Sequence, residues 1–165
     1  MIFDLRNIVL FIHILLAVIW FGSVLFIGWG VFPTSNKLKP TDQRQFLINL
    51  MKWVHWPLTL TGLSVIITGI ILGTYLGPLK NWNIIISTLY GHIFLTALII
   101  AIFILFWGVF ISYKHSINIF SKIEIWTQAE NGNYRPLQKA FISIAAVESV
   151  EIFGFFIILI CMVLI

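Results

Sequence analysis

Long stretches without a charged residue are the feature that most constrains this chain. Three stretches contain no Asp, Glu, Lys or Arg, and they lie between Arg6 and Lys37, between Lys52 and Lys80, and between Lys80 and Lys114. Each exceeds the ~20 apolar residues that an α-helix needs to cross ~30 Å of hydrocarbon. A fourth apolar stretch follows Lys139 and contains only two charged residues, Glu148 and Glu151.

These stretches predict four transmembrane helices, at about 8–32, 54–76, 87–112 and 141–164. The composition agrees, because 60% of the residues are hydrophobic and only 10% are charged, whereas about a quarter of the residues of a soluble domain are charged. Short connections make consecutive helices antiparallel neighbours. We therefore expect an all-α fold, an up-down-up-down four-helix bundle that forms a single transmembrane domain over residues 1–165.

The basic residues predict how the bundle is oriented. Eight of them fall in the two connections at about 33–53 and 113–140, namely Lys37, Lys39, Arg44, Lys52, Lys114, Lys122, Arg135 and Lys139. The opposite side has only Arg6 and Lys80. Short loops rich in Lys and Arg stay in the cytoplasm, so both termini are expected outside, in the plasma membrane of a prokaryote. This explains the net charge of +4 without a nucleic-acid partner. Apolar residues in the second loop predict a segment lying on the membrane surface.

Two histidines lie at matched depth in the predicted helices. His13 and His92 are each about one and a half turns from the outer end of a helix, and those two helices run in the same direction. Polar residues within a span are costly and tend to be functional. Two imidazoles facing each other across a bundle can hold a b-type haem, and imidazole also binds copper. The alternative is that each histidine makes an ordinary interhelical hydrogen bond.

The other two histidines lie at the opposite end of the bundle. His55 begins the second predicted helix and His115 follows the third, so the two are also level. They could form a second haem site near the headgroups. Alternatively, His55 between Trp53 and Trp56 is an interfacial anchor, and His115 belongs to an ordinary basic boundary.

Two further groups of residues are candidates for a cofactor site. Trp20 and Gly22 could form part of the wall of a haem pocket, or could simply serve helix packing. Cys161 and Met162 lie near the outer end of the fourth helix, at the level of the first histidine pair. Their soft sulfur atoms could join those histidines in a copper site, although both residue types are also common apolar filler.

Two carboxylates interrupt the fourth predicted helix. Glu148 and Glu151 are three positions apart and therefore share a face of that helix. Both cannot remain charged in an apolar setting without a partner. They could carry protons, bind a cation, or face a wet mouth at the cytoplasmic end of the bundle.

The first helix carries a motif with a family resemblance. Its residues His13, Ala17, Trp20 and Gly22 match the pattern H-x-x-x-A-x-x-W-x-G. The segment resembles the opening of the copper-resistance protein D (CopD) family, and it is similar to the opening of HemJ-type protoporphyrinogen oxidases. The resemblance implies a small helical bundle in which His13 is a ligand of haem or a metal ion.

These observations lead to one preferred function and three alternatives. The preferred function is electron transfer by a membrane protein that binds haem b between His13 and His92, alone or as a small subunit of a larger redox complex. The alternatives are copper transport or resistance, a HemJ-like oxidase, and a structural subunit without a cofactor. If the chain is an enzyme, it is an oxidoreductase. Its expected partners are the lipid bilayer, quinone or other redox subunits, and further copies of itself.

Overall fold

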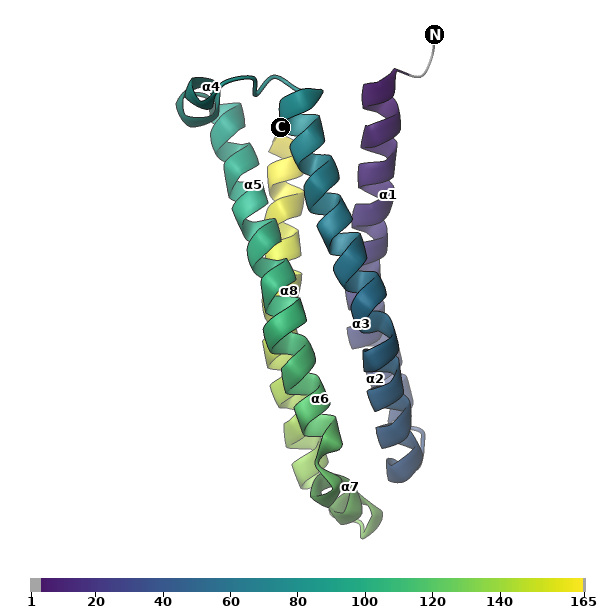
Figure 1. Cartoon of the computed structure of the whole chain (residues 1–165). Helices are drawn as coiled ribbons and strands as arrows, with labels where there is room; N and C mark the ends of the chain where they lie inside the picture. Colours follow the sequence, from purple (N-terminus) through teal and green to yellow (C-terminus); the bar gives the residue numbers. More distant parts are fainter. Residues whose placement is uncertain (1–3, 165) are drawn as a thin grey trace.

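The computed structural model describes residues 4–164, and every regular element in that range is helical. Four long helical segments form the molecule (Figure 1), and short π-helical turns (η) interrupt three of them without breaking their course. The first segment is α1 (Leu5–Phe26), η1 (Ile27–Val31) and α2 (Phe32–Ser35); the second is α3 (Pro40–Ile70) and η2 (Ile71–Tyr75). The third is α5 (Leu89–Phe106), η3 (Trp107–Ser112) and α6 (Tyr113–Ser121); the fourth is α8 (Arg135–Leu164). Two short helices, α4 (Trp82–Ser87) and α7 (Ile123–Glu130), lie in the connections.

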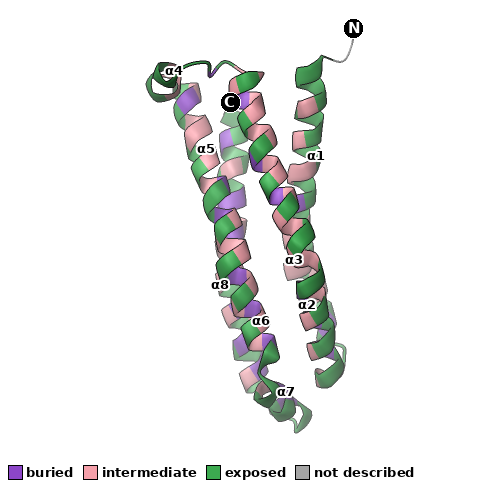
Figure 2. Ribbon diagram, in the orientation of Figure 1, coloured by how far each residue is buried: buried purple, intermediate pink, exposed green. Residues whose placement is uncertain are grey.

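All four long segments are long and apolar enough to cross a membrane. Their outward faces expose many large apolar side chains, such as Phe11, Val18, Ile99 and Phe153, and exposed positions run along the whole length of each helix (Figure 2). Such a surface is stable in lipid, where apolar side chains need no polar cover. The chain is therefore a multi-pass membrane protein with four candidate spans, as the charge-free stretches predicted.

The four segments alternate in direction, and both ends of the described chain lie at the same end of the bundle (Figure 1). Helix α1 packs mainly against α3 and to a smaller extent against α8, while α5 packs against α3 and α8. Helices α1 and α5 are therefore diagonal across the bundle. We call the end with both termini the terminal end, and the end with the α2–α3 and α6–α7–α8 connections the basic end.

The helices extend well beyond the predicted limits at the basic end. The second segment, Pro40–Tyr75, has 36 residues and would measure ~54 Å if straight, which exceeds the ~30 Å of a hydrocarbon core. The predicted connections at 33–53 and 113–140 are consequently mostly helical. The sequence limits were set by apolar length, but a helix continues into water as long as its backbone remains hydrogen-bonded.

A well-packed core closes the basic end. Leu47, Phe120, Trp126 and Ile144 are all buried there. The indole Nε1 of Trp126 and the guanidinium Nε of Arg44 both donate to the carbonyl oxygen of Phe120, at 3.0 Å and 3.1 Å. Helix α7 thus packs Trp126 and Ala129 on the bundle.

A second buried layer crosses the middle of the bundle. Trp20, Ile104 and Phe155 form it, and the rings of Trp20 and Phe155 meet edge to face with centroids 4.8 Å apart. Gly62 on α3 leaves room for the Trp20 ring, because a Cβ atom at Gly62 would lie 2.8 Å from that ring. This layer divides the interior into two compartments.

Candidate functional site

Two cavities lie on either side of the buried layer. The terminal-end cavity has a volume of about 490 Å³ and is lined by α1, α3, η2, α5 and α8. The basic-end cavity has a volume of about 80 Å³ and lies between the same four helical segments, nearer the basic end. Trp20 lines both cavities, so its indole forms part of the partition between them.

His13 lines the terminal-end cavity in a defined orientation. Its Nδ1 atom lies 2.8 Å from the hydroxyl oxygen of Thr68 on α3. That hydroxyl donates its own proton to the backbone carbonyl of Ser64, at 2.7 Å. Donation from Thr68 to Ser64 is compatible with the tautomer in which Nδ1 of His13 carries the proton and donates to the Thr68 oxygen. In that tautomer the lone pair of the neutral ring is on Nε2, the nitrogen that can bind a metal ion.

A glycine stripe on α3 and η2 makes room for the side chains around this cavity. A Cβ atom at Gly69 would lie 3.1 Å from Cε1 of His13, and one at Gly73 would lie 2.2 Å from the ring of Phe94. This face of α3 and η2 receives an imidazole and a phenyl ring.

The remaining wall of the terminal-end cavity is almost entirely apolar. Its aromatic residues include Trp20, Phe21, Phe94 and Phe155. Three further side chains could interact with a polar or metal-containing ligand, and they are Arg6, Tyr90 and Met162. A volume of this size lies within the ~300–1,000 Å³ range of small-molecule sites. The cavity therefore suits a large apolar ligand that is fixed by a few directed contacts.

The structure does not bring His92 together with His13. His92 lies on an exposed face of α5 and outside the lining of the terminal-end cavity. Its Nε2 atom is hydrogen-bonded to the carbonyl oxygen of Ile86 at 2.7 Å. Although α1 and α5 are diagonal, the rotation of α5 turns Phe94 and Ala97 into the cavity and His92 away from it.

His55 and His115 are likewise not paired. His55 stacks on the ring of Tyr113, with centroids 3.8 Å apart, and lines the basic-end cavity. His115 follows Tyr113 by two residues on α6. Its Nε2 atom is hydrogen-bonded to the hydroxyl of Ser143 on α8, at 2.9 Å. Each imidazole has a separate partner on a different helix.

The residues proposed for copper are also dispersed. Met162 lines the terminal-end cavity with His13, whereas Cys161 is buried outside it. Within residues 4–164, no group of three or more His, Cys, Asp or Glu side chains could hold a metal ion. Gly22 is exposed and lines neither cavity, so of the two predicted pocket residues only Trp20 is in a wall.

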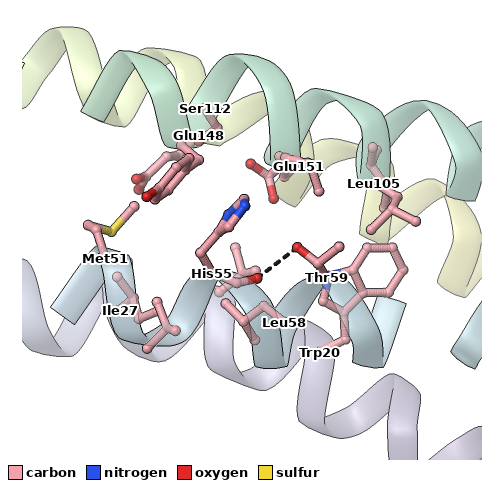
Figure 3. A pocket seen from close by; sticks show the side chains of 16 residues that line it. Trp20, Ile27, Met51, His55, Leu58, Thr59, Leu105, Ser112, Glu148 and Glu151 are labelled. Carbon is pink, nitrogen blue, oxygen red and sulfur yellow. Dashed lines mark hydrogen bonds between the residues drawn. The ribbon is translucent and has the colours of Figure 1, made fainter. Parts of the chain in front are cut away.

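The two glutamates of α8 meet at the basic-end cavity (Figure 3). Glu151 is only 8% exposed, and its carboxylate lies against Gly108, where a Cβ atom would approach Oε2 to 2.9 Å. It also lies beside the hydroxyl of Ser112. Glu148 is partly buried and lies beside Ser116. The cavity lining contains no Lys or Arg, so neither Arg135 nor Lys139 neutralises the pair within it.

Sequence reasoning missed the residues that orient these groups. Thr68 is hydrogen-bonded to His13, Tyr113 stacks on His55, and Ser112 and Gly108 adjoin Glu151. Their only signal in the sequence is that small polar residues and glycines occur within apolar helices, which is common in membrane proteins.

The chain was also compared with known proteins. No family model, no curated protein and no solved structure matches it. The fold and the two cavities describe a multi-pass helical membrane protein with four candidate spans, an apolar cavity at one end and a cavity lined by two glutamates at the other.

Proposed function

We propose that this protein binds a b-type haem in the terminal-end cavity and serves in electron transfer in the plasma membrane. In this proposal, Nε2 of His13 is an axial ligand of the iron. The observation that carries the proposal is the hydrogen bond from His13 to Thr68, because it leaves the ligating nitrogen free in an imidazole that lines an apolar cavity.

The other residues of the cavity fit the same group. Ligating histidines usually donate their second ring proton to a nearby oxygen, which fixes the ring and raises its basicity. Flat aromatic walls and close-packed glycines accommodate a planar macrocycle. Arg6, near the terminal end of α1, supplies positive charge for the haem carboxylates. When bound, the haem supplies one-electron exchange at its iron.

His92 faces away from the cavity, so a second protein ligand would have to come from another residue. Met162 is the residue we propose, because it lines the cavity and a thioether can hold haem iron. A His and Met pair would give the haem a higher potential than two histidines. The redox partner that we propose is a quinone or a neighbouring redox subunit.

The membrane orientation belongs to this proposal as well. The basic end carries eight of the ten Lys and Arg residues of the chain, which supports a cytoplasmic location for that end. The haem would then lie in the outer half of the membrane. The His13-to-Gly22 motif supports a distant relationship to the CopD and HemJ-type families, which we include in the proposal.

The copper alternative receives less support than haem. Copper would need several soft or imidazole ligands around one point, and of the four predicted ligands only His13 and Met162 line the same cavity. An apolar cavity of about 490 Å³ is much larger than a metal ion needs but suits an extended organic group.

The direct test is an absorption spectrum of the purified protein after expression with sufficient haem, oxidised and then reduced with dithionite. We expect a b-type spectrum and one haem per chain by pyridine haemochrome assay. A colourless protein would overturn the proposal. Two haems per chain would contradict the assignment of a single site and would favour a second site near His55 and His115.

A further inference from the structure

The basic-end cavity contains a cluster of titratable side chains that electron transfer at His13 does not use. Glu148 and Glu151 come from α8, His55 comes from α3, and Tyr113 comes from α6. In Figure 3 the carboxylate of Glu151 and the imidazole of His55 both point into the cavity. We propose that this cluster is a proton-exchange site, at which the two glutamates bind and release protons through water in the cavity.

The charges around the cavity favour proton binding. No Lys or Arg is among the lining residues, and the basic side chain that lines the cavity is His55 of α3. The lysine of α6, Lys114, lies over the ring of Phe110 instead, with Nζ 5.7 Å from the centroid. Two carboxylates on one helical face repel each other when both are ionised. The cluster therefore needs at least one proton, held by a glutamate or by His55.

A buried hydroxyl lies beside the glutamate pair. Ser116 is 1% exposed and adjoins Glu148, but its hydroxyl forms no hydrogen bond of normal geometry among residues 4–164. An unpaired hydroxyl is costly in a closed interior. A small approach of the Glu148 carboxyl group would satisfy it.

The cavity has room for water. Its volume of about 80 Å³ can hold several water molecules, since one needs ~10–15 Å³ of such space and two to four polar partners. The carboxylates, the hydroxyls and the imidazole provide those partners. His55 is only partly buried and stacks on Tyr113, so part of its ring is open to the surface of the bundle.

A metal ion is not the ligand that this geometry favours. His55, Glu148 and Glu151 line one cavity, but within the described chain they do not converge as a group of three that could hold a metal. A proton needs only one carboxylate oxygen at a time. In each exchange, one proton moves between a carboxylate oxygen and a water molecule; only O–H bonds form and break, and no electron moves.

The site is tested by infrared spectroscopy of the purified protein in lipid, without any haem requirement. We expect a carboxylic-acid C=O band near neutral pH that shifts in D₂O and disappears reversibly as the pH is raised. Glu148→Gln and Glu151→Gln should each remove part of this band. Glu124→Gln, a change of an exposed glutamate on α7, should leave it intact.

Three results would overturn the proposal. One is that no acid band is present near neutral pH, and another is that the band does not respond to pH or D₂O. The third is that the band is lost when sodium replaces choline at constant pH, which would indicate a cation site instead. If the glutamine variants do not fold, the titration and isotope shift of the unmodified protein still decide the question. Because these measurements do not depend on haem, their failure is distinguishable from failure of the proposed electron-transfer function.

Discussion

Nδ1 of His13 lies 2.8 Å from the hydroxyl oxygen of Thr68, and this hydrogen bond joins α1 to α3 inside the apolar bundle. The Thr68 hydroxyl is also within 2.7 Å of the carbonyl oxygen of Ser64. When Thr68 donates to Ser64, Nδ1–H of His13 donates to Thr68. That tautomer leaves the lone pair of the ring on Nε2.

Replacing Thr68 with Val removes the acceptor while keeping the shape of the side chain. Outer partners of metal-bound histidines typically contribute ~10–100-fold to affinity, so we expect haem binding to weaken by roughly that factor in a titration of the apoprotein. Thr61→Val is the matched control, because its hydroxyl also bonds to a backbone carbonyl on α3 but lines neither cavity. Equal loss in both variants would show that the effect is general helix destabilisation.

Replacing Gly73 with Ala should fill part of the terminal-end cavity. The new methyl group would lie 2.2 Å from the ring of Phe94, which must turn into the cavity to avoid it. Overpacking of this kind costs ~1–3 kcal/mol, and we expect the haem content after purification to fall. Gly28→Ala is the control, since nothing lies within 4 Å of a Cβ atom there. Unchanged haem content in Gly73→Ala would mean that the ligand does not reach Phe94.

Replacing Trp20 with Ala should join the two cavities. The indole is 4% exposed and packs on Phe155, and loss of such a side chain typically costs ~3–5 kcal/mol. We expect a corresponding decrease in the free energy of unfolding, measured by denaturant titration in detergent. Trp29→Ala provides the comparison. Trp29 is 73% exposed, so its replacement should change the free energy of unfolding little. Similar losses for both variants would argue against a central packing layer at Trp20.

Replacing Arg44 with Met should loosen the basic end only slightly. The guanidinium donates to the backbone carbonyls of Phe120 and Ser121, but Trp126 also donates to Phe120. The Phe120 carbonyl therefore keeps a partner, and we expect a loss of ~1 kcal/mol, within the net range of one hydrogen bond. Hydrogen exchange at α7 should rise, and it should stay unchanged in Lys52→Met. Faster hydrogen exchange confined to the terminal end would contradict this account.

The sequence was sufficient to predict the four spans, because charge-free length is a strong and local signal. It did not predict where the helices end, since polar residues such as Gln43 and Arg44 continue a helix outside the hydrocarbon. It also did not predict how α7 packs. The burial of Trp126 depends on a carbonyl of α6, and no local pattern reports that contact.

The direction of the candidate site residues could not be predicted from the sequence. The direction of His92 depends on the rotation of α5 about its own axis. That rotation is set by which small and aromatic residues pack inward, such as Phe94 against Gly73 and Ile104 against Gly154. Glu148 and Glu151 were easier, because three-residue spacing places two side chains on one face whatever the rotation.

The most direct test of the central claim compares His13→Ala with His92→Ala in the same reduced-minus-oxidised spectrum of haem-replete protein. Our account predicts that His13→Ala loses the b-type band and that His92→Ala keeps it at full intensity, because only His13 lines the cavity. Loss of the band in His92→Ala, or its retention in His13→Ala, would contradict the account.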